Sequence, residues 1–197
     1  QIVTQYVLRY AERNGVKTNW RKPVIKFAGA DDELFSELKK IVSPTHALPQ
    51  DYLADAKTVI CYFIPFAESV AHSNIEGRYS SKEWAAAYLE TNNLIANLND
   101  HLQKELGLLG FKSTLIPATH NFDQDKLISD WSHRHVAYIA GLGKFGLNKM
   151  LITDQGCCGR VGSIITNLKI EPSKRSTEEY CLYKSKGTCK ICVQRCV

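Results

Sequence analysis

The end of the chain carries cysteines whose spacing suits iron-sulfur ligation. Residues 189–197 read CKICVQRCV, so Cys189, Cys192 and Cys196 form a C-x-x-C-x-x-x-C run. Bacterial four-iron clusters are held by C-x-x-C-x-x-C-x-x-x-C-P, in which the fourth cysteine binds a second cluster. The spacing therefore predicts thiolate ligands to four-iron clusters in this region.

The run lacks the first cysteine of the four-cysteine motif. Lys186 stands in the expected place, and Val197 replaces the usual proline. We expect Cys181 to supply the missing thiolate, because the loop that follows could bring it back toward the run. The first cluster would still need a fourth ligand, and the second would need partners for Cys196. We therefore expect a fragment of a longer protein, and the start at Gln1 agrees with this expectation.

A glycine-rich segment is the second candidate site. Residues 140–148 read AGLGKFGLN, in which Gly141, Gly143 and Gly146 form G-x-G-x-x-G. In dinucleotide-binding proteins this pattern follows a strand, opens a helix and precedes an acidic residue by about 20 positions. Here the preceding residues are predicted to be helical and the acidic residue is missing, so we exclude that function. Two interpretations remain: a sharp turn that lets a flat ligand approach the backbone, or the glycine-rich end of a helix.

These segments belong to an ordered series that resembles the epoxyqueuosine reductases. The series is AGLGKFGLN at 140–148, LIT at 151–153, GRVGSIIT at 159–166, and GTC at 187–189 with the cysteines that follow. In that family the first block reads A-G-L-G-W-x-G-K-N and the last reads C-G-T-C-x-x-C-x-x-x-C-P. GRY at 77–79 resembles a further block, so the resemblance covers about residues 79–197. The chain resembles a divergent, truncated member of this family, which is related to the corrinoid reductive dehalogenases.

The resemblance implies a cobalamin-binding α/β core followed by a ferredoxin-like segment with two four-iron clusters. In that family the clusters reduce cobalt, and cobalt removes an oxygen substituent from a modified tRNA base. The implied partners are a ferredoxin or flavodoxin as electron donor and tRNA as substrate. The residues expected to bind the corrinoid are Tyr79, Gly141, Leu142, Gly143, Lys144, Phe145, Gly146, Arg160, Gly162 and Ser163. The expected cluster ligands are Cys181, Cys189, Cys192 and Cys196.

Asp130 and His133 are the expected catalytic residues. The family's acidic residue lies just before the helix at 131–140, and Asp130 is the nearest carboxylate. A carboxylic acid beside a reduced metal could deliver a proton if burial raises its pKa. As an alternative, Asp130 caps the helix in competition with Ser129. His133 and His135 point to different sides of a helix, so we expect one to face the corrin or substrate and the other to be structural.

The chain departs from the family pattern at two positions of the glycine-rich block. Lys144 replaces its tryptophan and Leu147 replaces its lysine. The helix before the block also begins with the polar run WSHRH at 131–135. These departures allow a substrate that differs from that of the family.

Four further residues carry reactive side chains. His120 follows a predicted strand, where it would ligate a metal or cap a turn. Arg160 would contact a phosphate or propionamide, or lie in a solvated loop. Cys157 and Cys158 are expected to be structural, because free cysteine is commonly buried.

The pattern of apolar residues predicts an α/β core over residues 1–170 and the start of a ferredoxin-like segment over 171–197. Helices are predicted from residue 2 and at 31–42, 79–109 and 131–140. Strands are predicted at 57–66, 111–117, 151–153 and 161–170, the last two as a hairpin around residues 155–159. The continuous apolar run at 57–66 predicts a central strand covered on both faces. With the resemblance, these elements predict a mixed sheet flanked by helices, as in cobalamin-reductase and nitroreductase-like cores.

Composition limits the class of protein. The 197 residues are 44% hydrophobic, which suits an ordinary globular core. The odd count of seven cysteines favours free or metal-bound thiols over disulfides, and we predict a cytoplasmic protein without a membrane span. The net charge of +5 comes from 25 basic and 20 acidic residues that are interspersed, so nucleic-acid binding is allowed but not indicated.

Three classes of function compete. The order of the blocks favours a redox enzyme in which clusters feed a corrinoid. The alternative is an iron-sulfur electron-transfer protein without cobalamin chemistry. A closed zinc site of the four tail cysteines is disfavoured, because zinc sites usually pair two short C-x-x-C units across a longer loop.

Overall fold

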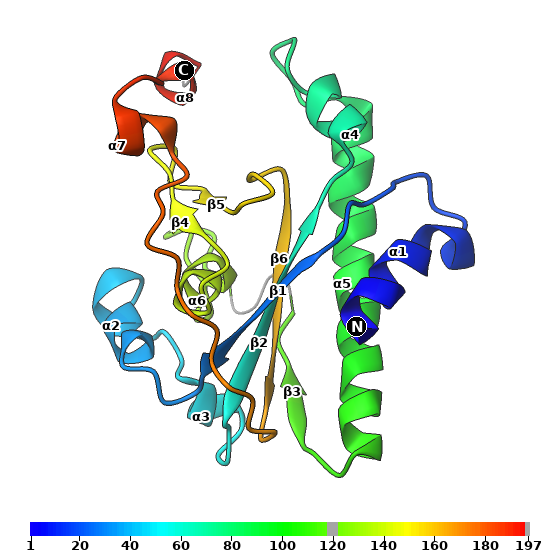
Figure 1. The fold of residues 1–197 in the computed structure, drawn as a ribbon, viewed down its shortest axis with the longest axis vertical. Helices are drawn as coiled ribbons and strands as arrows, with labels where there is room; N and C mark the ends of the chain where they lie inside the picture. Colours follow the sequence, from blue (N-terminus) through cyan, green and yellow to red (C-terminus); the bar gives the residue numbers. More distant parts are fainter. Residues whose placement is uncertain (118–121, 196–197) are drawn as a thin grey trace.

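The computed structural model describes residues 1–117 and 122–195. A four-stranded sheet forms its centre, in the order β1 (Val24–Gly29), β2 (Thr58–Pro65), β6 (Gly159–Thr166) and β3 (Ser113–Leu115) (Figure 1). Each neighbouring pair of strands is antiparallel. The prediction of a mixed sheet is therefore wrong. Strands covered on both faces read as continuous apolar runs whichever way they pair, so the sequence pattern did not define their direction.

Strand β2 has the central position that its sequence predicts. All eight of its residues are buried. Alternate side chains enter two separate cores: Val59, Cys61 and Phe63 lie in one. Ile60 and Tyr62 lie in the other, on the opposite face of the sheet. The sheet thus separates two layers of helices.

The long helix α5 (Lys82–Leu108) covers one face of the sheet together with α1 (Ile2–Asn14) and α4 (Glu68–Ser73) (Figure 1). Ser81 caps α5, since its Oγ accepts a hydrogen bond from the Trp84 N–H at 3.0 Å. Leu94 and Leu98 of α5 are fully buried against the sheet. The predicted helix at 79–109 is confirmed with a later start.

The opposite face carries α6 (His133–Ile139), with α2 (Leu34–Ile41) beside it and α3 (Pro49–Tyr52) in the same layer (Figure 1). Ser132 occupies the N-cap position of α6, so the helix begins two residues later than predicted. The alternative roles of Asp130 and Ser129 as the cap are therefore not observed. Trp131, which directly precedes this cap, is only 1% exposed and packs with Phe35 in the core of this face.

A second, two-stranded sheet pairs β4 (Lys144–Phe145) with β5 (Leu151–Ile152). The predicted hairpin between 151–153 and 161–170 is wrong, because β5 pairs with β4 whereas β6 pairs with β2 and β3. Residues 153–158 form the connection from this small sheet to the central one.

The C-terminal segment runs along the free edge of β1 before it reaches α7 (Leu182–Lys186) and α8 (Ile191–Gln194) (Figure 1). Ser173 and Phe27 exchange two hydrogen bonds of 2.9 and 3.0 Å. Arg175 then forms an ion pair of 2.8 Å with Asp32. These contacts fasten residues 173–175 to the core.

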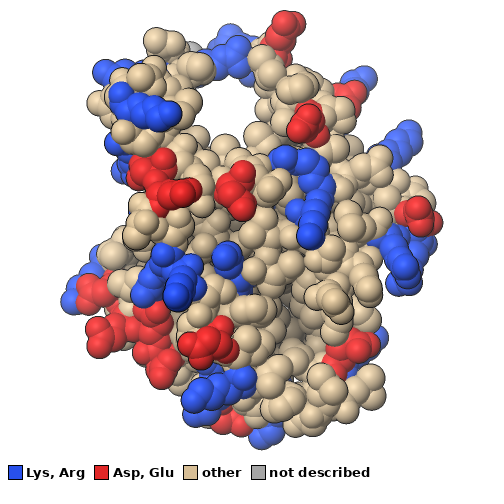
Figure 2. Space-filling model, viewed as in Figure 1, with Lys and Arg blue, Asp and Glu red and all other residues tan. Residues whose placement is uncertain are grey.

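In the view of Figure 2, basic and acidic side chains are interspersed over the surface, as the sequence indicates. Within the described ranges, no helix is long and apolar enough to cross a bilayer.

Candidate functional site

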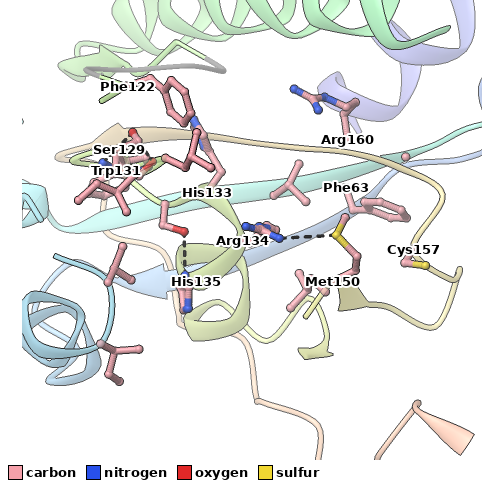
Figure 3. A pocket seen from close by; sticks show the side chains of 18 of the residues that line it. Phe63, Phe122, Ser129, Trp131, His133, Arg134, His135, Met150, Cys157 and Arg160 are labelled. Atoms are coloured by element: carbon pink, nitrogen blue, oxygen red, sulfur yellow. Dashed lines mark hydrogen bonds between the residues drawn. The ribbon is translucent and has the colours of Figure 1, made fainter. Parts of the chain in front are cut away.

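A cavity of about 780 Å³ opens beside α6 and extends to Tyr88 of α5, which belongs to the helical layer on the other face of the sheet. Its walls come from α2, β2, α5, α6 and β6 and from the segments at 122–132 and 150–157 (Figure 3). Aromatic side chains form part of the lining: Phe63, Tyr88, Phe122 and Trp131. Cavities of about 300–1,000 Å³ with apolar and aromatic walls are typical of sites for small molecules and cofactors.

Positive charge dominates the polar part of the lining. Arg134 and Arg160 both line the cavity, whereas no carboxylate does so among the residues that the structure describes. The Arg160 guanidinium lies 4.2 Å from the centre of the Tyr88 ring, and its Nε donates to Asn92 Oδ1 at 3.1 Å. Arginine held in this way can present its remaining N–H groups to phosphate or amide oxygens.

His133 belongs to a hydrogen-bonded network with the buried residues Trp131 and Ser163. Trp131 Nε1 donates to Ser163 Oγ at 3.1 Å, and Ser163 Oγ lies 3.0 Å from His133 Nδ1. Because the hydroxyl accepts from the indole, it can donate to Nδ1, which places the imidazole proton on Nε2. Nε2 lies 2.9 Å from the carbonyl oxygen of Pro117, which accepts that proton. The network holds the ring in one orientation.

Asp130 lies against the segment at 45–47 and is not among the residues that line the cavity. Its Oδ1 accepts a hydrogen bond from Thr45 Oγ1 at 2.7 Å, and its carbonyl oxygen accepts one from the Ala47 N–H at 2.9 Å. His46 completes this connection through Ser132, whose N–H donates to His46 Nε2 at 3.0 Å. The segment therefore fixes the turn that leads into α6.

His135 lines the cavity one helical position beyond Arg134. Its Nδ1 lies 2.7 Å from Ser132 Oγ, and its ring packs on Phe145 with 4.7 Å between centres. Burial lowers the pKa of His135, and the positive charge of Arg134 lowers it further. Its Nε2 has no hydrogen-bonding partner in the part of the chain that the structure describes.

The glycine-rich block packs against the protein's own chain. A side chain at Gly143 would place a Cβ 2.2 Å from the Ile152 carbonyl oxygen, and one at Gly141 would lie 3.0 Å from the Lys174 oxygen. Gly141 also has a φ of +82°, and the N–H of Leu142 bonds to the Ala137 carbonyl, as at a helix end. The interpretation as a glycine-rich helix end accounts for these positions, and their ligand-binding role stays a prediction.

The other expected corrinoid-binding residues are dispersed. Among the described residues, Arg160 lines the cavity, whereas the other expected corrinoid-binding residues are not part of its lining. Tyr79 is 84% exposed in the segment before α5, and Lys144 donates to the Thr177 carbonyl at 2.8 Å. A Cβ at Gly162 would lie 2.5 Å from the Tyr62 hydroxyl, so this glycine accommodates a neighbouring strand.

The tail cysteines that the structure describes form no metal-binding cluster. Cys181, Cys189 and Cys192 are partly exposed free thiols, and Cys196 lies outside the described residues. In residues 1–117 and 122–195, no group of three or more His, Cys, Asp or Glu side chains is placed to hold a metal. A hydrogen bond from the Lys184 N–H lowers the pKa of Cys181, which favours the thiolate. His120 also lies outside the described residues.

Sequence reasoning missed most of the cavity wall. Phe63, Tyr88, Phe122 and Arg134 are ordinary core or surface types at their positions, and no local spacing marks them. His46, which is fully buried, was also missed. Its pairing with Ser132 joins residues 86 positions apart, which no single-sequence pattern reports.

No protein-family model and no curated protein matches the chain. Solved structures do match. The epoxyqueuosine reductase from Streptococcus thermophilus aligns over 91% of this chain and 50% of its own, with a TM-score of 0.52 and 18% identity. The fold is that of the epoxyqueuosine reductases. One such enzyme in complex with an epoxyqueuosine-modified tRNA-Tyr stem loop aligns over 98% of this chain and 52% of its own, with a TM-score of 0.58 and 20% identity.

The Bacillus subtilis epoxyqueuosine reductase was solved with its catalytic aspartate loop swung out of the active site. It aligns over 98% of this chain and 52% of its own, with a TM-score of 0.55 and 19% identity. The chain thus spans about half the length of the solved structures that it matches. At this level of identity the likeness defines the architecture, and the site must be argued from the chain's own residues.

Proposed function

We propose that this chain is the cofactor-binding core of an oxidoreductase similar to the epoxyqueuosine reductases. The proposed activity is reductive removal of a substituent from the substrate, with a corrinoid bound in the cavity beside α6. The observation that carries this proposal is the cavity, which combines aromatic walls and two arginines with the reductase fold.

The residues of the cavity fit part of a corrinoid. Such a group presents a broad apolar face with amide and phosphate groups around it. Phe63, Tyr88 and Phe122 offer apolar area for the face, whereas Arg134 and Arg160 offer donors for the peripheral oxygens. When bound, the corrinoid would supply electrons to the substrate from a reduced metal.

The chain's own residues would control the protons at this site. His135 lines the cavity and engages Ser132 through Nδ1. If the Ser132 hydroxyl donates to that nitrogen, Nε2–H remains to donate toward a ligand in the cavity. His133 is already held by Ser163 and the Pro117 carbonyl, so its proposed role is to position the cavity wall. Asp130 remains a proposed proton donor and would have to leave Thr45 to reach the cavity.

Iron-sulfur binding is proposed from the spacing of Cys181, Cys189, Cys192 and Cys196. The described thiols are not arranged to hold a cluster, so the proposal includes no electron-transfer step through a cluster. The proposed electron donor is a ferredoxin or flavodoxin. By analogy with the tRNA stem loop bound to one similar enzyme, the proposed substrate is a modified tRNA.

Equilibrium dialysis against cobalamin tests the proposal on the chain as it stands. We expect saturable binding at one site, and several-fold weaker binding by Arg160→Gln. Arg9→Gln is the matched control, because Arg9 lies on α1 and is not among the residues that line the cavity. Absence of binding, or equal loss in both variants, would overturn the assignment of the cavity.

A further inference from the structure

Cys157 and Cys158 lie in the connection between β5 and β6, at one end of the cavity. Both are free and only partly buried, unlike Cys61, which is fully buried in the core. Cys157 lines the cavity, and Figure 3 shows it at the same end as Phe63 and Met150. The pair is therefore accessible, in contrast to the structural role expected from the sequence.

The two thiols interact, and Cys158 also has a positive neighbour in Arg21. The Cys157 thiol donates a hydrogen bond to the Cys158 sulfur, which lowers the pKa of Cys158, and the charge of Arg21 lowers it further. The same hydrogen bond raises the pKa of Cys157. The pair thus combines a sulfur that favours the thiolate with a neighbouring thiol.

Arg21 is fixed in this position. Its Nε donates to the Phe66 carbonyl at 3.0 Å, and its NH2 group donates to the Gln155 carbonyl at 2.8 Å. The Phe66 N–H in turn donates to the Cys158 carbonyl at 2.9 Å. Backbone contacts from the end of β2 and from the connection itself therefore hold the guanidinium near Cys158.

Adjacent cysteines are poorly suited to a disulfide. Consecutive Cα atoms lie about 3.8 Å apart across a trans peptide. Disulfides usually need about 4.4–6.8 Å between Cα atoms, so this bond would be strained. A single larger atom that binds both sulfurs does not require the S–S bond. Soft thiolate ligands select thiophilic metals and metalloids.

We propose that Cys157 and Cys158 form a chelating site for a trivalent thiophilic metalloid, of which arsenic(III) is the example, at the wall of the cavity. With phenylarsine oxide, two S–As bonds form and the As–O bonding is lost. The two thiol protons leave with the oxide oxygen as water, and no electrons are transferred. Chelation by these thiols requires neither a bound corrinoid nor the tail cysteines.

Peptide mapping tests the site in the whole chain. The reduced protein is treated with excess phenylarsine oxide and digested with trypsin, which should release residues 150–160 with Cys157 and Cys158 as the peptide's own cysteines. We expect one phenylarsenic group on this peptide and no free thiol. An adduct restricted to the peptides that carry Cys181, Cys189, Cys192 and Cys196, with residues 150–160 unmodified, would overturn the proposal.

Single variants distinguish chelation from modification of one thiol. Cys157→Ser and Cys158→Ser should each lose the stable adduct on residues 150–160, whereas Cys61→Ala should keep it. Arg21→Gln should slow alkylation of this peptide by iodoacetamide several-fold at neutral pH, and Arg21→Lys should restore most of the rate. Retention of the adduct by either serine variant would contradict chelation by the pair.

Discussion

His46 Nε2 accepts a hydrogen bond from the Ser132 N–H at 3.0 Å, which joins the loop after α2 to the N-cap residue of α6. His46 Nδ1 lies 2.9 Å from its neighbour's carbonyl at Ala47, so Nδ1 carries the proton and the ring is neutral. The ring is fully buried and stacks on Trp131 with 5.8 Å between centres. One imidazole therefore positions the turn that contains Asp130 and the wall that contains Trp131.

Replacement of His46 tests this connection. His46→Ala should lower the free energy of unfolding by about 1–3 kcal/mol, because the partly buried Ser132 N–H loses its acceptor. His46→Gln can present an amide oxygen near the position of Nε2 and should lose less. Urea unfolding of both variants measures the difference. Equal losses would indicate that ring volume matters and the hydrogen bond does not.

Acid should destabilise the fold through the same histidine. Burial lowers the pKa of His46 below its usual value of 6.5, and it likewise lowers that of His135. At a pH between 6.5 and the pKa of His46 in the folded protein, the unfolded chain binds more protons than the folded chain does. The contribution of His46 to stability is therefore complete above pH 6.5 and is lost progressively as the pH falls below 6.5. Urea unfolding at a series of pH values should show this loss, with a shallower slope for His46→Gln. A profile unchanged by His46→Gln would contradict the assignment of this histidine.

Removal of the Ser163 hydroxyl should lower the stability of the fold. Ser163→Ala leaves Trp131 Nε1 without its acceptor and takes the hydroxyl from His133 Nδ1, so we expect a loss of about 1–3 kcal/mol. Ser113→Ala is the matched control, because the Ser113 hydroxyl is buried without a hydrogen-bonding partner among the described residues. That variant should be neutral or stabilising. Thermal denaturation monitored by circular dichroism compares the two.

Two glycine substitutions distinguish the steric cost of an added Cβ from the stabilisation gained by lower backbone entropy in the unfolded chain. Gly143→Ala would place Cβ 2.2 Å from the Ile152 carbonyl oxygen and should cost about 1–3 kcal/mol or more. Gly107 lies in α5, and a Cβ at this position would have no atom within 4 Å, so Gly107→Ala should stabilise by about 0.5–1 kcal/mol. Chemical denaturation of both variants is the measurement. A tolerated Gly143→Ala would reopen the interpretation of this segment as a ligand contact.

The sequence predicted elements whose signal is local. Strand β2 is a continuous apolar run, and α5 repeats apolar residues at helical spacing, so both were found. Strand β1 was missed, because Val24–Gly29 is short and contains Lys26 and Gly29. The pairing of β6 between β2 and β3 depends on contacts across about 100 residues in the case of β2, which local patterns do not encode.

The candidate site was predicted less completely than the fold. Arg160 and His133 were expected to lie at the site, and both line the cavity. The glycine-rich block was selected for its spacing, but its packing against residues 152 and 174 explains that spacing without a ligand. The hydrogen bonds that join His46 and Thr45 to residues 130–132 could not be predicted from the sequence, because they form only when the loop after α2 packs against the turn before α6.

Titration of the chain with cob(II)alamin under anaerobic conditions, followed by electron paramagnetic resonance, tests corrinoid binding most directly. We predict a saturable change to the base-off signal, with weaker saturation for Arg160→Gln than for Arg9→Gln. A spectrum that remains that of free cob(II)alamin at every protein concentration would contradict corrinoid binding in this cavity.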